Sequence, residues 1–169
     1  RPEQVQADFE WIDPSAPVNQ AIDDVRMAAS AKDVRIQVDA PAEFHKIVAA
    51  LRRLRQLYSN VLSNAVKFSP DNGLVTLRAR DETEYLVVEI LDQGPGIPSD
   101  ERSLVFEDFF RGRNASGVAG SGLGLSIVKK IVEAHEGEIR IESPYESGHG
   151  GTKVTITIPR RLMTPEMKR

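Results

Sequence analysis

The chain has 169 residues and a net charge of -3, with 40% of its residues hydrophobic and 28% charged. This size and composition are typical of one globular domain with a substantial core, and the weak acidity without a clustered basic face argues against nucleic-acid binding. Cysteine is absent, which excludes disulfides, thiol catalysis and cysteine-ligated metals, and no apolar run approaches the roughly 18 residues that cross a bilayer.

The first third of the chain predicts a strand, a helix and a second strand. Residues 1–7 are polar and unpatterned, and we expect a disordered end or the remnant of a linker there. A short strand over residues 8–12 leads into the turn Asp13-Pro14-Ser15, which can cap a helix over residues 17–31. Residues 34–38 alternate strictly between polar and apolar, which predicts a strand with one buried face.

Residues 51–70 predict a helix that has a polar edge beside its apolar stripe. The stripe comprises Leu54, Leu57, Val61, Ala65 and Phe68, and the edge comprises Asn60, Asn64 and Lys67. Two carboxamides one turn apart can offer neutral oxygens to a hard cation, and the lysine suits a phosphate. The pattern therefore indicates a helix bordering a pocket, although an ordinary solvent-facing polar edge would look the same.

The rest of the chain predicts strands around one further amphipathic helix. An antiparallel pair is expected over residues 74–80 and 85–91, then a short helix over 99–105, and a segment without periodicity over 106–122, which is typical of a functional or mobile loop. A helix over residues 123–135, with Leu125, Val128, Val132 and His135 facing inward, precedes two closing strands over 138–142 and 153–158.

Two glycine-rich segments carry candidate chemistry. Asp92 follows a predicted strand and enters a turn built on Gly94 and Gly96, where backbone can approach a flat ligand and the carboxylate can accept from an amine on it. An ordinary tight turn is the alternative. Residues 120–125 run directly into a helix start, whose free amides favour phosphate, although a flexible loop would also be rich in glycine. Neither a P-loop nor a dinucleotide fingerprint is present.

These motifs, taken in order, resemble the ATP-binding catalytic domain of bacterial sensor histidine kinases, in the gyrase, heat-shock chaperone and histidine kinase ATPase superfamily. The matching segments are residues 60–68 (the N box), 92–97 (the G1 box), 106–111 (the F box), 120–125 (the G2 box) and 150–152 (the last glycine motif). The resemblance covers residues 8–159 and implies an α+β fold, a two-layer α/β sandwich of the Bergerat type with a mixed, mostly antiparallel sheet packed on about three main helices. Residues 160–169 are expected to form a solvated basic tail.

The resemblance also implies ATP and Mg2+ as ligands and a role for each matching residue. Asn64 would bind Mg2+ with Asn60 beside it, Lys67 and Arg111 would contact phosphates, and Asp92 would pair with the adenine amine. Asn60, Lys67 and Arg111 are the expected catalytic residues. The remaining nucleotide-binding residues would be Phe68, Gly94, Gly96, Ile97, Gly120, Ser121, Gly122, Leu123, Gly124, Leu125 and Thr152. A purely structural role is an equally good prediction for Phe68.

Asn60 favours a kinase over a hydrolase, because the hydrolysing branches carry a water-activating Glu at that position and a carboxamide cannot accept a proton. None of His45, His135 and His149 has the family's phosphoacceptor context. We therefore expect the acceptor histidine on a separate dimerisation domain ahead of Arg1, in a homodimeric and membrane-anchored parent that signals to a response regulator receiver domain. This part would be a cytoplasmic domain, monomeric when isolated. An anti-sigma-type serine kinase and a non-catalytic nucleotide-sensing module remain the alternatives.

Overall fold

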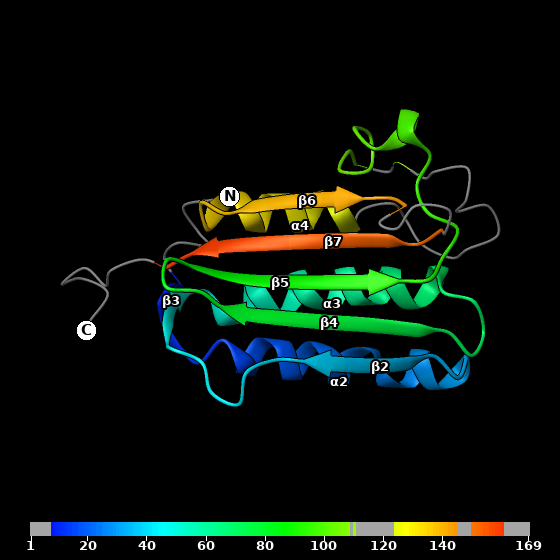
Figure 1. The fold of residues 1–169 in the computed structure, drawn as a ribbon. Helices are drawn as coiled ribbons and strands as arrows, with labels where there is room; N and C mark the ends of the chain where they lie inside the picture. The colour runs from blue at the N-terminus through cyan, green and yellow to red at the C-terminus, as the bar shows by residue number, and fades with distance from the viewer. Residues whose placement is uncertain (1–7, 109, 111–123, 145–149, 161–169) are drawn as a thin grey trace.

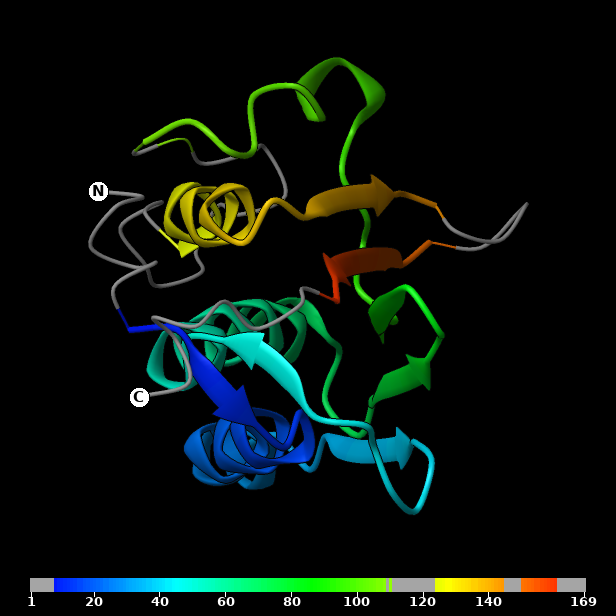
Figure 2. The same cartoon turned by 90° about the vertical axis from the view of Figure 1, so that its left-hand side faces the viewer.

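The computed structural model describes residues 8–108, 110, 124–144 and 150–160 of the chain. Its main body has two layers, a five-stranded sheet and three helices on one face of that sheet (Figure 1). Figure 2, turned by 90°, shows the three helices on one side and the five-stranded sheet on the other. The expected two-layer α+β sandwich is confirmed. None of the described helices is both long and apolar enough to cross a membrane.

The large sheet is mixed and mostly antiparallel, as the resemblance implied. Its strand order is β2-β4-β5-β7-β6, and only the β2–β4 pair is parallel. The strands are β2 (Arg35–Asp39), β4 (Leu74–Asp81), β5 (Tyr85–Asp92), β6 (Glu138–Glu142) and β7 (Thr152–Pro159). A separate antiparallel pair joins β1 (Glu10–Ile12) to β3 (Ile47–Ala49). Strand β3 was not predicted from the sequence, because its three residues are all buried and show no alternation.

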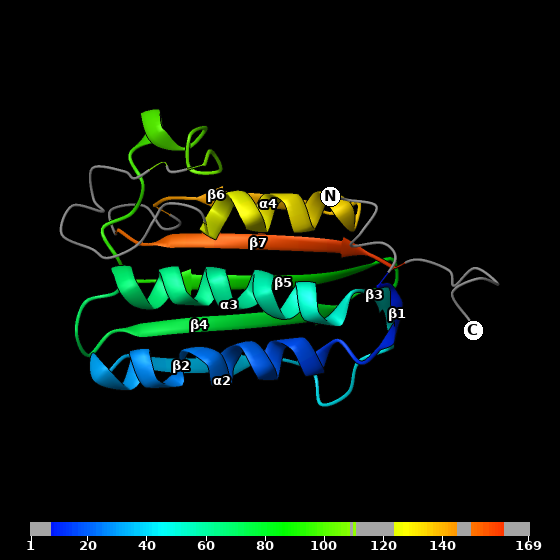
Figure 3. The same ribbon diagram turned by 180° about the vertical axis from the view of Figure 1, so that it is seen from behind.

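The three helices are α2 (Ser15–Ala31), α3 (Leu51–Phe68) and α4 (Gly124–Ala134). Figure 3 shows α3 in the middle of the helical layer, between α2 and α4. Its buried residues Leu54, Leu57, Val61 and Ala65 belong to one core cluster with the inward-facing residues of β4, β5 and β7. Phe68 is only half-buried and lies outside that cluster, so the predicted stripe ends before it. The helix stops at Ser69, whose extended backbone is the conformation that the following Pro70 favours.

Two local predictions need correction. The predicted helix over residues 99–105 is a single 3-10 turn, η1 (Ser99–Glu101), followed by hydrogen-bonded turns. Only Glu101 and Val105 are buried there, so the segment lacks the apolar face that would stabilise a longer helix. Leu125, expected to face inward from α4, is half-buried, and Ile131 occupies the core beside Val128.

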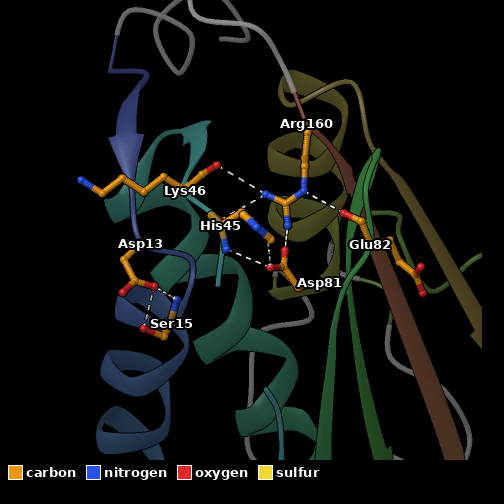
Figure 4. Close-up of polar contacts among 7 residues, drawn as sticks. All are labelled: Asp13, Ser15, His45, Lys46, Asp81, Glu82 and Arg160. Carbon is orange, nitrogen blue, oxygen red and sulfur yellow. Dashed lines mark hydrogen bonds and ion pairs between the residues drawn. The ribbon is translucent and has the colours of Figure 1, made fainter. Parts of the chain in front are cut away.

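Arg160 differs from the expected solvated tail, because it closes a polar cluster at one end of the sheet (Figure 4). Its guanidinium forms an ion pair with Asp81 and donates to the carbonyl oxygens of Glu82 at 2.8 Å and His45 at 3.1 Å. The side chain of Asp81 is only 10% exposed, and its second oxygen accepts from the backbone amide of His45 at 2.8 Å. Arg160 therefore links the end of β7 to the β4–β5 hairpin and to the segment before β3.

The turn before α2 is also visible in Figure 4. Asp13 accepts hydrogen bonds from the backbone amide of Ser15 at 2.9 Å and from its hydroxyl at 2.8 Å. These hydrogen bonds lower the pKa of Asp13 from its ordinary value. The helix begins at Ser15, two residues earlier than predicted, because this turn already orders the chain there.

Candidate functional site

The candidate site lies at the end of the sheet opposite the Arg160 cluster. Strand β5 ends there at Asp92 and β7 begins there at Thr152, and these two residues face each other in the β5–β7 register. The C-terminal half of α3 and the start of α4 reach the same end of the molecule (Figures 1 and 3). The sheet and both helices thus bring together segments that lie far apart in the sequence.

Asp92 is a buried carboxylate at the end of β5, with 9% of its surface exposed. Its Oδ1 accepts a hydrogen bond from the backbone amide of Gly94 at 2.8 Å. Burial raises its pKa from the ordinary 3.8 to about 6, although backbone hydrogen bonds from Gly94 and Thr152 act in the opposite direction. A desolvated carboxylate with free acceptor capacity is suited to bind an amine on a ligand.

The turn after Asp92 packs against the end of α3. A Cβ at Gly94 would lie 2.7 Å from the carbonyl oxygen of Phe68, so only glycine fits between the turn and the helix. Phe68 itself is half-buried beside this contact. The structure thus brings Phe68 next to the turn of Asp92, and its role beside a base stays a prediction.

Gly96 and Ile97 complete the turn and contact a residue that the sequence analysis missed. Gly96 has a φ of +84°, a conformation that side-chain-bearing residues rarely adopt. The Ile97 amide donates to the hydroxyl of Ser143 at 2.7 Å. Ser143 follows β6 and is separated from Ile97 by 46 positions, and a serine at the end of a strand carries no recognisable sequence signal.

The polar edge of α3 faces the start of α4. The side-chain amide of Asn60 donates to the carbonyl oxygen of Gly124 at 3.4 Å, and a Cβ on Gly124 would lie 4.0 Å from the amide nitrogen of Asn64. Both asparagines are half-buried, whereas Lys67, near the end of the helix, is exposed. The edge is therefore not an ordinary solvent face, because its two carboxamides meet the first residue of another helix.

Several predicted site residues lie outside the described part of the chain. They are Arg111, Gly120, Ser121, Gly122 and Leu123. Within the described part, no group of three or more His, Asp or Glu side chains could hold a metal ion. A metal bound among these residues would therefore depend on neutral oxygens such as those of Asn60 and Asn64, together with oxygens of the ligand.

Comparison with known proteins agrees with the motif resemblance. A family model described as histidine kinase-, DNA gyrase B- and HSP90-like ATPase matches residues 49–162. The chain is 38% identical over 164 residues to the signal transduction histidine-protein kinase/phosphatase MprB of Mycolicibacterium paratuberculosis, covering 95% of this chain and 30% of that protein. It is 37% identical over 139 residues to the adaptive-response sensory kinase SasA of a Synechococcus species, covering 81% of this chain and 36% of that protein.

A solved structure supports the same assignment at the level of the fold. The mycobacterial sensor histidine kinase MprB superposes with a TM-score of 0.78 at 35% sequence identity, and the match covers 92% of this chain and 99% of the solved one. The chain spans about a third of the length of the curated relatives it matches.

Proposed function

The chain belongs to the family of histidine kinase-, DNA gyrase B- and HSP90-like ATPases, and from this membership we propose that it binds ATP with Mg2+ and transfers the γ-phosphoryl group to a histidine of a separate dimerisation domain. The named relatives are histidine kinases, which supports the kinase branch of the family. The proposal concerns the part of such a kinase that holds the nucleotide.

The residues around Asp92 suit the adenine. The Asp92 carboxylate would accept from the exocyclic amine, and the backbone of Gly94, Gly96 and Ile97 would lie against the ring, because glycine leaves room for a flat ligand. Thr152 stands opposite Asp92 in the neighbouring strand and donates its backbone amide to that carboxylate. Phe68 would contact the base from the end of α3.

The residues along α3 and the start of α4 suit the phosphates. Asn64, with Asn60 beside it, offers the neutral oxygens that a hard cation such as Mg2+ accepts, and the bound ion would neutralise charge on the phosphates. Lys67 adds a positive charge at the end of the same helix.

The start of α4 offers backbone amides to the phosphates. Gly124 and Leu125 are the first two residues of this helix, where the helix dipole favours an anion. Arg111 and residues 120–123 are proposed to contact the phosphates as well.

The residue type at position 60 favours phosphoryl transfer over hydrolysis of ATP. Its side-chain amide donates to the Gly124 carbonyl oxygen at 3.4 Å, and a carboxamide cannot take a proton from water. The site thus lacks the general base that a hydrolase needs at this position. In the transfer itself, the bond between the γ-phosphorus and the ADP oxygen breaks, a bond to an imidazole nitrogen forms, and positive groups stabilise the charge on the moving phosphoryl group.

The described histidines of this chain support an acceptor elsewhere. His135 is buried, its Nδ1 donates to the Ile131 carbonyl oxygen at 2.9 Å, and its Nε2 accepts from the Ala50 amide at 3.1 Å. His45 contacts Asp81 at the end of the sheet opposite Asp92. His149 lies outside the described residues.

We propose that the acceptor histidine belongs to a dimerisation domain of the parent protein. This parent would be a membrane-anchored homodimer that passes the phosphoryl group to a response regulator on the cytoplasmic side.

Labelled ATP tests this function directly. The chain would be incubated with [γ-32P]ATP and Mg2+, alone and with the dimerisation domain of its parent. We expect slow phosphate release by the chain alone and acid-labile label on the added domain. Rapid phosphate release by the chain alone would identify a hydrolase instead. Acid-stable label on a serine-containing partner would identify a serine kinase, and binding without any transfer would identify a nucleotide-sensing module.

A further inference from the structure

The hydroxyl of Ser143 joins three segments of the candidate site. It accepts from the Ile97 amide at 2.7 Å, donates to the Gly151 carbonyl oxygen at 2.9 Å and lies 3.1 Å from the hydroxyl of Thr152. A serine hydroxyl can donate one hydrogen bond and accept two, so these three contacts use its whole capacity when Thr152 acts as the donor. Ser143 is 1% exposed, which makes each of these hydrogen bonds costly to lose.

The residues that Ser143 contacts at the start of β7 also hydrogen-bond to the turn of Asp92. The Gly151 amide donates to the Gly94 carbonyl oxygen at 2.7 Å, and the Thr152 amide hydrogen-bonds to the Asp92 carboxylate. Ser143 holds the exit of the turn at Ile97 to the same strand start that these two hydrogen bonds use. The turn is thus fixed to β7 at its middle by Gly151 and at its end by Ser143.

The hydrogen-bond partners of Ser143 all lie in the turn after Asp92 or at the start of β7, which is the part of the site proposed for the base. Asn60 and Asn64 lie on α3 and contact the start of α4 instead. A change at Ser143 should therefore alter the position of the turn relative to Asp92 without altering the groups proposed for the metal and the phosphates.

We infer that Ser143 is a positioning residue for the adenine base, because its hydroxyl fixes the Ile97 end of the turn to the start of β7, where the Thr152 amide hydrogen-bonds to Asp92. This inference rests on the proposed nucleotide function. Ser143 touches neither the base nor the phosphates in this role, and it acts through Ile97, Gly151 and Thr152. Its loss should weaken ATP binding and the preference for adenine over guanine, and it should leave phosphoryl transfer at saturating ATP unchanged.

The test compares three variants with the unmodified chain. Ser143→Ala removes the hydroxyl, and Ser143→Thr retains it as the rescue variant. Ser69→Ala is the matched control, because Ser69 is 3% exposed near the same site and its hydroxyl donates only to the Ala65 carbonyl oxygen, which keeps the Ser69 amide as a partner. Calorimetry would give the dissociation constants of ATP and GTP with Mg2+, and phosphorylation of the dimerisation domain would give the transfer rate at saturating ATP.

We expect Ser143→Ala to raise the dissociation constant of ATP about tenfold and to reduce the preference for ATP over GTP. Its transfer rate at saturating ATP should stay within about twofold of the unmodified chain. Ser143→Thr should recover most of the affinity, and Ser69→Ala should bind ATP like the unmodified chain. Equal binding by Ser143→Ala and the unmodified chain would overturn the inference, and so would an equal loss in Ser69→Ala.

The same measurements distinguish an error in this inference from an error in the proposed function. If the proposed function is wrong, the unmodified chain itself will not bind ATP. If Ser143→Ala does not fold, hydrogen exchange of the Ile97 amide in the unmodified chain tests the inference instead. The Ile97 amide should be protected without nucleotide, since it donates to a buried hydroxyl. Exchange of that amide as fast as in an unstructured peptide would overturn the inference.

Discussion

The ammonium group of Lys32 lies 2.6 Å from the carbonyl oxygen of Ser69, so the end of α2 donates a hydrogen bond to the end of α3. The same ammonium donates to the carbonyl oxygens of Val66 and Lys67, each at 2.9 Å. Carbonyl groups at the end of a helix lack partners within it, and the helix dipole favours a cation there. Lys32 thereby holds together two helices at the residues that adjoin Phe68 and the turn of Asp92.

Replacing Lys32 should destabilise the fold. We expect Lys32→Ala to lower the free energy of unfolding by about 1.5–3 kcal/mol, because the partly buried carbonyl groups of Val66 and Ser69 lose a charged donor. Chemical denaturation would measure the change. Lys130→Ala, on an exposed position of α4, is the control and should change the free energy by less than about 0.5 kcal/mol. Equal effects of the two substitutions would contradict this role of Lys32.

Arg160 should contribute to stability without affecting nucleotide binding. We expect Arg160→Ala to lower the free energy of unfolding by about 3 kcal/mol, because it leaves the Asp81 carboxylate without its charged partner. ATP affinity should not change, since Asp81 and Asp92 lie at opposite ends of the β4–β5 pair. Arg140→Ala is the control, because that side chain is 67% exposed. A large loss of ATP affinity in folded Arg160→Ala would show that this cluster influences the site.

The raised pKa of Asp92 predicts a specific dependence of stability on pH. The unfolded chain releases this proton near the ordinary 3.8, whereas the folded chain holds it to about 6. The folded state therefore binds more protons in this range, and the contribution of Asp92 to stability decreases by about 2–3 kcal/mol as the pH rises from about 4 to about 6. Asp92→Asn should lack this decrease, so its stability relative to the unmodified chain should increase over that range. Denaturation curves across the range test this, and a constant difference between the two proteins would contradict it.

The same carboxylate should select adenine. An ionised Asp92 accepts from the amine of adenine but faces the keto oxygen of guanine, which would cost about 1–3 kcal/mol in unpaired polar groups. ATP should therefore bind more tightly than GTP, with affinity declining below about pH 6 as Asp92 is protonated. Asp92→Asn should lose most of the preference, whereas Asp23→Asn on α2 should retain it. Competition binding at several pH values measures this, and equal affinity of the unmodified chain for both nucleotides would refute it.

Asn64 should be required for metal-dependent binding. We expect Asn64→Ala to remove the Mg2+-dependent part of ATP affinity while the fold stays intact, because the half-buried side chain lies outside the core cluster. Calorimetry with and without Mg2+ measures the difference, and circular dichroism monitors folding. Asn19→Ala, on an exposed position of α2, is the matched control. Unchanged affinity for Mg2+ and ATP in folded Asn64→Ala would exclude the metal assignment.

The sequence by itself determined the helices and the long strands. Residues such as Leu54, Leu57 and Val61 recur at helical spacing because one face of α3 is buried, and the alternation in β4 has the same cause at a period of two. Periodicity does not detect elements that are short or wholly buried, which is why β3 was missed and η1 was predicted too long. It also could not distinguish Arg160 from the tail that follows it.

For the candidate site, the sequence determined which chemical groups are available, and the tertiary structure decided which of them meet. Asp92 and the asparagines of α3 were recognisable because their motifs are local in the chain. Ser143 contacts Ile97 across 46 positions, and Asn60 contacts Gly124 across 64. Such contacts depend on strand order and helix packing. The hydrophobic pattern of one segment indicates which of its faces is buried, but it does not indicate which other segment packs against that face.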